Sequence, residues 1–491
     1  MKKYLLASAC VLVLSATLTS CNDFLDKQPL DQVGATAFWK TTKDADKALA
    51  AVYASFRNST FSAVPAAGPS TELEYLSDNA VVRGTGGAPL NIQSGGINAS
   101  TGGVLDDMWT NSFKGIAAAN YFLDNCDQVK DLYSEADFNK LKGEALFVRA
   151  FFYNELVVHY GDVPLMLKSA KVGDGYDKKP RTPRAEVVTQ MLEDVDFAIK
   201  WLPNIAYTNG HAVQGSAVVL KCRILLNEHR YSDVAKLAGD YIHDSKNPFS
   251  LADDYAGIFF GKQENNPEIM FSIQFKAPDD FHALDQMVGS RMTIFPSSAL
   301  RADYEEGDPR IKMTMYEIGD PWPNNPKSGK FEADGNKAEG LIPFTNLAFK
   351  KYVNPNVAVP KASTLSDQHI IKMRYADLLL MYAEAMFESG QGTDPLALQA
   401  LNDVRQRPGV MMPKKSELTR EIIRKERRIE LAYEGIRYYD IIRWDIAKDV
   451  IPNIVYDEKG RKRKFDGNLW PIPQSQMDIM RDVWEQNAPW D

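Results

Sequence analysis

The residue types that usually carry catalysis or hold metal ions occur here without the spacings that such sites require. The six histidines form no pair at the helical spacing of metal ligands, and neither an HExxH nor a CxxC motif occurs. Among 65 aspartates and glutamates, close acid pairs arise by chance, so none indicates the two-carboxylate site of a glycosidase. The sequence therefore predicts no catalytic residue, no metal site and no cofactor.

Two aromatic residues in an irregular segment are better candidates for binding chemistry. Trp322 lies among prolines and asparagines in the run 321–326, and Tyr316 precedes the same run. An exposed aromatic ring can stack on a flat face of a ligand, while planar polar groups nearby hydrogen-bond to it. We expect Trp322 to serve as such a platform and Tyr316 to flank it. The alternative is that both rings only pin the loop onto the body of the protein.

The N-terminus has the layout of an export signal. Two lysines precede an apolar stretch over residues 4–19, and a Leu-Thr-Ser-Cys run ends at Cys21. Signal peptidases accept small residues before the cleavage point, and a cysteine directly after it resembles the bacterial lipobox. We expect residues 1–20 to be removed, Cys21 to be acylated as a membrane anchor, and residues 21–40 to form a tether. The alternative is a plain signal peptide in which Cys21 is incidental.

Composition limits the remaining classes of protein. The chain has 491 residues with 57 basic and 65 acidic side chains and a net charge of −8, so we expect no nucleic-acid partner. After the N-terminal stretch, no run approaches the ~20 apolar residues of a membrane helix. Four cysteines exclude a disulfide scaffold. Cys126 and Cys222 stay available to pair with each other, and the sequence leaves this open.

Apolar residues recur at helical spacing through most of the chain. Residues 137–158 carry an apolar stripe at steps of three and four, and residues 186–202 repeat it. Further helices are expected at residues 42–57, 214–229, 231–244, 374–389, 394–406 and 416–446. Short polar turns and closely packing alanines favour tetratricopeptide-type stacking. The expected fold class is mainly α, an α-helical solenoid of tetratricopeptide-like helix pairs with loop-rich insertions.

Two regions interrupt the helical pattern, and we expect them to carry the function. Residues 59–106 cluster Gly, Ser, Asn and Pro, and residues 247–372 are rich in Pro, Gly, Asn and aromatic residues. Long irregular segments in compact proteins are usually functional loops. We therefore divide the mature chain into a helical part at 41–246 with a ligand loop at 59–106, a loop-rich insertion at 247–372 on the ligand face, and a helical part at 373–491.

Several runs of sequence resemble, in order, the motifs of the SusD/RagB family. The central one is GEALFVRAFFY at residues 143–153, followed by HYGDVPL at residues 159–165. The others are FW at 38–39 before TKDA at 42–45, YADLLLMYAEA at 375–385, LNDVR at 401–405, ERRIELAYEG at 426–435, RW at 443–444, LWPIP at 469–473 and NAPW at 487–490. The resemblance covers essentially the whole mature chain.

This resemblance implies a cell-surface lipoprotein of Bacteroidetes-type bacteria, anchored in the outer membrane and facing the exterior. Family members cap a SusC-like TonB-dependent outer-membrane transporter and help it capture oligosaccharides, and they are not enzymes. Their fold is a solenoid of tetratricopeptide-like pairs in which loops and small β elements form the ligand face. The implied function is therefore to capture an oligo- or polysaccharide and deliver it to such a transporter.

The resemblance also singles out two polar residues of the first loop. Asp78 and Arg83 match the family segment that supplies polar ligand contacts in the starch-binding prototype. Arg83 offers a fork of donors and Asp78 an acceptor, so together they could hold vicinal hydroxyls; the alternative is an ordinary ion pair. No aromatic residue lies between Tyr75 and Trp109, where the prototype carries a tryptophan platform. This departure argues against starch and leaves the glycan unidentified.

Other residues in the motifs are expected to be structural. The charged run at 426–430 is expected to pair with neighbouring charges and fix helix packing, rather than to bind an anion or act in catalysis. Trp39, Trp109, Trp444 and Trp470 are expected in the core.

Two other functions remain as alternatives. The fold also resembles members that serve peptide import, so the second hypothesis is an oligopeptide-binding lid of a TonB-dependent peptide importer. A peptide site favours backbone-matching polar groups in an enclosed groove, whereas a glycan site favours an exposed aromatic shelf. A surface glycoside hydrolase is a distant third hypothesis, supported only by chance carboxylates.

Overall fold

The computed structural model of the protein describes residues 38–58, 60, 69–82, 87–171, 173–282, 284, 293–322, 329–332, 344–354 and 366–490. Cys21 and Arg83 lie outside these ranges, so the roles expected of them stay predictions.

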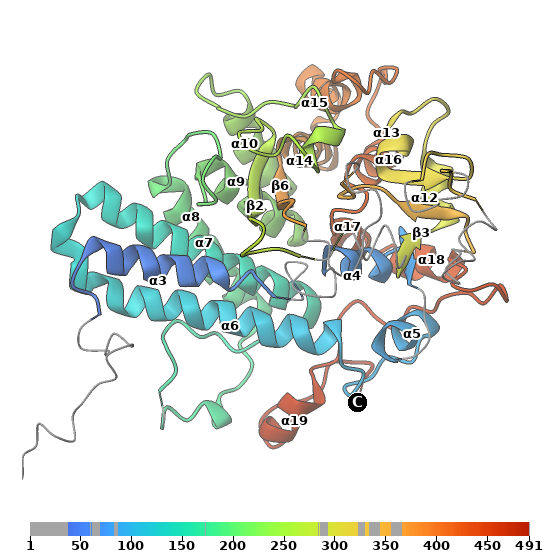
Figure 1. Ribbon diagram of the computed structural model, residues 1–491. Coiled ribbons are helices and arrows are strands. Elements are labelled where there is room, and N and C mark those ends of the chain that lie inside the picture. The colour runs from blue at the N-terminus through green and yellow to red at the C-terminus, as the bar shows by residue number, and fades with distance from the viewer. Residues whose placement is uncertain are drawn as a thin grey trace, which may run out of the picture.

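Three helices form one side of the molecule. Helix α3 (Thr42–Ala54) begins with a capping box in which the Thr41 hydroxyl accepts from the backbone N–H of Asp44 and the Asp44 carboxylate accepts from that of Thr41. It packs on α6 (Val104–Asn125) and α7 (Glu135–Tyr160), and the three lie side by side in Figure 1. The sequence pattern predicted α3 and α7, whereas α6 was not expected.

The helical stack continues through both parts of the chain. Helices α8 (Arg184–Trp201), α9 (Gln214–Asn227) and α10 (Tyr231–Ile242) follow α7, each packed on the one before. Helix α10 then packs on α14 (Tyr375–Met386), which pairs with α15 (Pro395–Gln406). The chain therefore leaves the stack after α10 and returns to it at α14. The expected mainly α class with consecutive packed helices is confirmed.

The single helix expected over residues 416–446 is wrong. The structure has two helices there, α16 (Arg420–Glu430) and α17 (Arg437–Arg443). Between them Tyr433 and Gly435 have φ angles of 63° and 74°, which a right-handed helix does not contain. The Tyr433 ring stacks on Phe349 with centroids 3.9 Å apart, so packing against the insertion favours the break.

The first irregular region contains regular structure that its composition did not reveal. It includes α4 (Pro69–Leu76), β1 (Ala80–Val82) and α5 (Gly87–Ser94). Strand β1 pairs antiparallel with β3 (Ile294–Pro296), and Val81 lies opposite Phe295. This small sheet joins the first loop to the later insertion.

The insertion is built from short elements around two further antiparallel strand pairs. Strand β2 (Ile269–Ile273) pairs with β6 (Ile370–Arg374), and β4 (Met315–Glu317) pairs with β5 (Leu347–Phe349). The short helices of the insertion and the C-terminal part are α12 (Ser298–Asp303), α13 (Arg310–Thr314), α18 (Ala447–Val450) and α19 (Gln474–Met480).

A large hydrophobic core runs through the helical stack and the base of the insertion. Trp39, Trp109 and Trp470 lie in it, as expected, and Trp444 is buried as well. Cys126 and Cys222 are both buried and free, so no disulfide joins them. Among the helices that the structure describes, none is both long enough and apolar enough to cross a membrane.

Candidate ligand-binding site

Trp322 and Tyr316 lie together, but inside the protein. They form a small apolar cluster with Phe331 and Ala348, in which Trp322 is 1% exposed and Tyr316 is 5% exposed. The two rings meet edge to face with centroids 4.6 Å apart, and the Trp322 backbone N–H donates to the Gly329 carbonyl. Neither ring offers a free face for stacking, contrary to the expectation of an exposed platform. The alternative, in which both rings pin the loop onto the body, describes their contacts.

Asp78 is also buried, at 2% exposure. Its carboxylate accepts two hydrogen bonds from Arg437, at 2.8 and 2.9 Å, and pairs with Arg428 at 3.0 Å. Burial by itself raises the pKa of Asp78, but the two guanidinium groups lower it well below its usual range. The carboxylate therefore ties the first loop to the C-terminal part, contrary to the expected contact with sugar hydroxyls.

Neighbours of Asp78 fasten the same loop. The side-chain oxygen of Asn79 accepts from Arg428 at 2.9 Å, and its nitrogen donates to Glu74 at 3.0 Å. Glu74 also accepts from the backbone N–H of Gly435 at 2.8 Å. Burial raises the pKa of Glu74 to about 7. The segment from α4 to β1 is therefore bonded to the break between α16 and α17.

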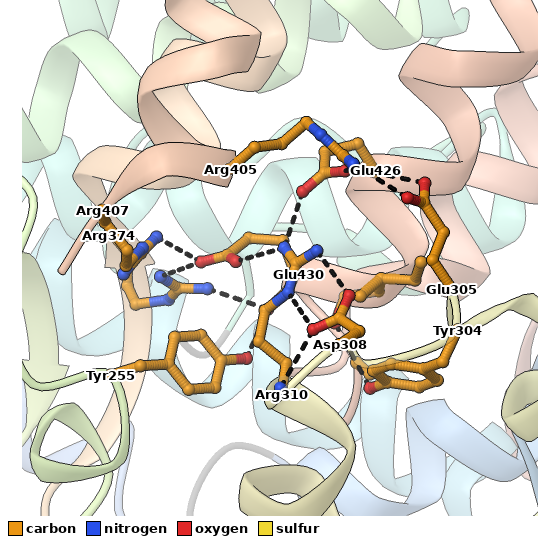
Figure 2. A network of polar contacts seen from close by, with 12 residues as sticks. Tyr255, Tyr304, Glu305, Asp308, Arg310, Arg374, Arg405, Arg407, Glu426 and Glu430 are labelled. Carbon is orange, nitrogen blue, oxygen red and sulfur yellow. Dashed lines mark hydrogen bonds and ion pairs between the residues drawn. The ribbon is translucent and has the colours of Figure 1, made fainter. Parts of the chain in front are cut away.

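The charged run at 426–430 belongs to a buried ionic network, shown in Figure 2. Arg310 donates to Glu426 at 2.6 Å and to Glu430 at 3.0 Å. Glu430 pairs also with Arg374 and Arg407. Burial opposes ionisation of Glu430, but these arginines lower its pKa to about 2. The expected structural role of this run is confirmed, because its charges join α16 to the insertion and to α15.

A polar cavity of about 1080 Å³ lies beside the β2–β6 pair. Its distinguishing feature is a set of side-chain amides, from Gln263, Asn265, Gln274, Asn354 and Gln368. Planar amides both donate and accept, which suits the paired hydroxyls of a sugar. Its volume matches the upper end of the ~300–1,000 Å³ typical of ligand sites. The sequence pattern did not single out these residues. It indicated only that the insertion is rich in polar residues.

Internal hydrogen bonds hold the walls of this cavity. Arg57, just after α3, donates to the Gln274 carbonyl at 2.8 Å and pairs with Asp280. The Gln263 side chain accepts from the backbone N–H of His369 at 2.7 Å and donates to the His369 carbonyl at 2.9 Å. Burial lowers the pKa of His369. A wall fixed in this way needs little ordering when a ligand binds.

Two family models match the chain. The one described as SusD family matches residues 289–490, and the one described as starch-binding associating with outer membrane matches residues 23–226. A curated relative, SusD-like protein P2 of Formosa agariphila, is 26% identical over 96% of this chain and 97% of the relative.

Solved structures share the fold. A SusD-like protein from Bacteroides fragilis is 25% identical with a TM-score of 0.78, covering 94% of this chain and 100% of that one. A SusD-like carbohydrate binding protein from the same species is 24% identical with a TM-score of 0.78, covering 91% and 100%. A laminarin binding SusD-like protein is 21% identical with a TM-score of 0.75, covering 92% and 100%. Family matches in both halves and a common fold show that the chain belongs to the SusD/RagB family.

Proposed function

We propose that the protein is a cell-surface glycan-binding lipoprotein, which captures an oligo- or polysaccharide and delivers it to a partner TonB-dependent outer-membrane transporter of the SusC type. Membership of the SusD/RagB family supports carbohydrate binding in general. The proposed binding site is the amide-lined cavity of about 1080 Å³ beside β2 and β6, and this cavity is the main structural support for the proposal.

The chemistry of the cavity suits a ligand recognised mainly through its hydroxyls. Two of its cations are already paired, Arg57 with Asp280 and Lys262 with Asp254, which lies 2.9 Å away. Its aromatic residues, Tyr207 and Phe275, are each 4% exposed. Hydrogen bonds to the amides would therefore contribute more than ring stacking does.

The proposed location is the outer membrane, with the lipid on Cys21 as anchor and the body facing the exterior. The match to a family described as associating with outer membrane supports this location. The export signal and lipobox-like run at the N-terminus support the anchor.

We also propose that the protein binds its ligand without hydrolysing it, as a member of a family of binding proteins. Asp280, one of the carboxylates that line the cavity, is engaged with Arg57. Incubation of the purified protein with polysaccharide should release no reducing ends. Asp367 is another carboxylate of the cavity lining, and release that Asp367→Asn abolishes would restore the hydrolase hypothesis.

An oligopeptide ligand is the second candidate. Side-chain amides can pair with the N–H and C=O groups of an extended peptide backbone as well as with hydroxyls. The same five amides therefore favour this alternative, and the buried state of Trp322 removes one argument against it.

A binding screen of purified residues 22–491 decides between these ligands. Affinity gels and calorimetry would cover polysaccharides, oligosaccharides and peptides. Gln274→Ala removes one cavity amide and should weaken glycan binding by about two- to tenfold, the effect of one hydrogen bond. Gln128→Ala, an exposed amide in the 3₁₀ helix Cys126–Leu132, is the matched control. A response to peptides alone would replace glycans as the ligand class.

A further inference from the structure

A second, smaller cavity of about 270 Å³ adjoins the amide-lined one. The two share Arg57, Ser272 and Gln274 as lining residues. The smaller cavity lies between the C-terminal end of α3, the turn at residues 209–211 and the end of β2. A ligand that occupies one cavity can therefore extend past Arg57 into the other.

Apolar side chains line one part of the smaller cavity. Ala50, Tyr53 and Ala54 come from α3, while Phe56 follows it and Phe271 comes from β2. The Phe56 and Phe271 rings lie 5.5 Å apart, and both are buried. The volume is close to the ~300 Å³ lower limit of ligand sites, which suits a single sugar ring with an apolar face.

His211, on the rim, is oriented by a buried carboxylate. Its Nδ1 lies 2.6 Å from Glu144, which also accepts from the Tyr53 hydroxyl and from Lys140, each at 2.7 Å. Burial opposes ionisation of Glu144, but His211 and Lys140 lower its pKa below the usual value. The anionic Glu144 therefore holds the proton on Nδ1. Nε2 of the ring makes no hydrogen bond within the described part of the chain, and the ring is 42% exposed.

Arg57 supplies a cationic group to the rim. Its side chain is 41% exposed and also pairs with Asp280, a residue of the larger cavity. Among the described residues that line the smaller cavity there is no aspartate or glutamate. The C-terminal end of α3 by itself disfavours an anion, because its last carbonyl groups carry partial negative charge. The positive charge of Arg57, placed directly after this end, offsets this effect, and a ligand carboxylate bound there would share the guanidinium with Asp280.

The turn at residues 209–211 closes on Gln274. Gly210 has a φ of +79°, and a Cβ there would lie 2.8 Å from the side-chain oxygen of Gln274. Only glycine allows this approach without strain. The approach brings the amides of Asn209 and Gln274 to the same rim as His211.

We infer that the smaller cavity is a subsite for a sugar ring that bears a carboxylate, the uronic-acid unit of an acidic glycan whose other units occupy the larger cavity. This inference rests on the proposed function and deepens it. The apolar side chains of α3 face the ring, Asn209 and Gln274 bond its hydroxyls, Nε2 of His211 accepts from a further hydroxyl, and the carboxylate accepts from Arg57. Hydrogen bonds between ionised groups are stronger than neutral ones, so the carboxylate determines the preference.

Calorimetry with matched ligands tests the inference. The probes are oligomers of galacturonate, glucuronate, mannuronate and guluronate, each compared with its carboxyl-reduced, neutral form. At least one acidic oligomer should bind about tenfold more tightly than its neutral form, the difference between a charge-assisted and a neutral hydrogen bond.

Variants of residues at the rim of the smaller cavity then test whether the rim causes the preference for acidic oligomers. Arg57→Gln should reduce the ratio of acidic to neutral affinity, while Arg57→Lys should restore part of it. Lys448→Gln, which removes an exposed cation of α18 that lines neither cavity, should leave the ratio unchanged. Melting temperatures identify variants that fold poorly, and a merely structural defect would weaken both forms alike.

The outcomes separate the inference from the proposed function. Equal binding of acidic and reduced oligomers would overturn the inference and leave glycan capture standing. A preference for acidic oligomers that survives in Arg57→Gln would also overturn it. Failure of every glycan, acidic or neutral, would overturn the proposed function and the inference with it.

Discussion

At the scale of single residues, Asp78 makes its contacts with two arginines that are 350 and 359 positions further along the chain. A carboxylate in a loop of polar composition has the same sequence signature whether it binds a ligand or an arginine. Burial separates the two roles, because a buried carboxylate is stable only when its charge is matched. Asp78 thus contributes to the attachment of the first loop rather than to an exposed contact.

Asp78→Asn should therefore act on stability. The substitution leaves Arg428 and Arg437 without their shared carboxylate, and breaking a buried pair costs about 3–5 kcal/mol. Urea unfolding followed by circular dichroism would measure the loss, with the exposed Asp253→Asn as control, expected within about 0.5 kcal/mol of the wild type. Unchanged unfolding together with lost glycan binding would return Asp78 to the ligand site.

We predict that two buried carboxylates change the stability of the protein with pH in opposite directions. The pKa of Glu430 is lowered from 4.5 to about 2, so its contribution to stability is present above pH 4.5 and is lost as pH falls toward 2. The pKa of Glu74 is raised from 4.5 to about 7, so stability falls as pH rises through that interval. Melting temperatures across pH 2–8 should show both losses. Glu74→Gln should remove most of the loss between pH 5 and pH 7; a curve unchanged by it would contradict this assignment.

At the scale of elements, the contact of α6 with α7 depends on one glycine. A Cβ at Gly115 would lie 2.1 Å from the Phe152 ring, closer than any atoms can pack. Helix α6 was not expected from the sequence, and its close approach to α7 is a property of the pair rather than of either helix.

Gly115→Ala should separate α6 from α7. Overpacking of this kind costs about 1–3 kcal/mol, although alanine by itself favours a helix over glycine by about 1 kcal/mol. Gly143→Ala, in α7, is a matched control: its Cβ would lie 3.5 Å from the nearest atom, an ordinary contact. Thermal unfolding should show a lower Tm for the first variant and an equal or higher Tm for the second. A Gly115→Ala protein as stable as wild type would show that Phe152 can move.

At the scale of the whole molecule, the helical stack supports an insertion that meets it along β2. The amide-lined cavity draws residues from just after α3, from the segment before α9 and from both sides of the β2–β6 pair. Such a cavity exists only when the insertion is packed on the first helical part. Binding and stability of the stack should therefore be linked.

The anchor is also tested at this scale. Cys21→Ser should abolish acyl labelling and move the protein from the membrane fraction to the soluble exported fraction, because the body has no other proposed attachment to lipid. Fractionation after labelling with a tagged fatty acid measures both effects. The purified variant should bind glycans as well as wild type does. Retention in the membrane without label would point to the transporter as the attachment.

The sequence by itself determined the helical stack except for α6, because a 3.6-residue period is a local property that survives in any context. It also carried the family motifs, the core tryptophans and the structural role of the charges at 426–430. Only the tertiary structure decided the break between α16 and α17, the burial of Trp322 and Asp78, and the position of the cavities. The break and the burial of Asp78 depend on partners far away in the chain, whereas Trp322 is buried by other residues of the same insertion. The residues that pack against an aromatic ring determine whether it is exposed for ligand stacking or holds a loop on the body of the protein. In the same way, packing determines whether a carboxylate contacts a ligand or an arginine.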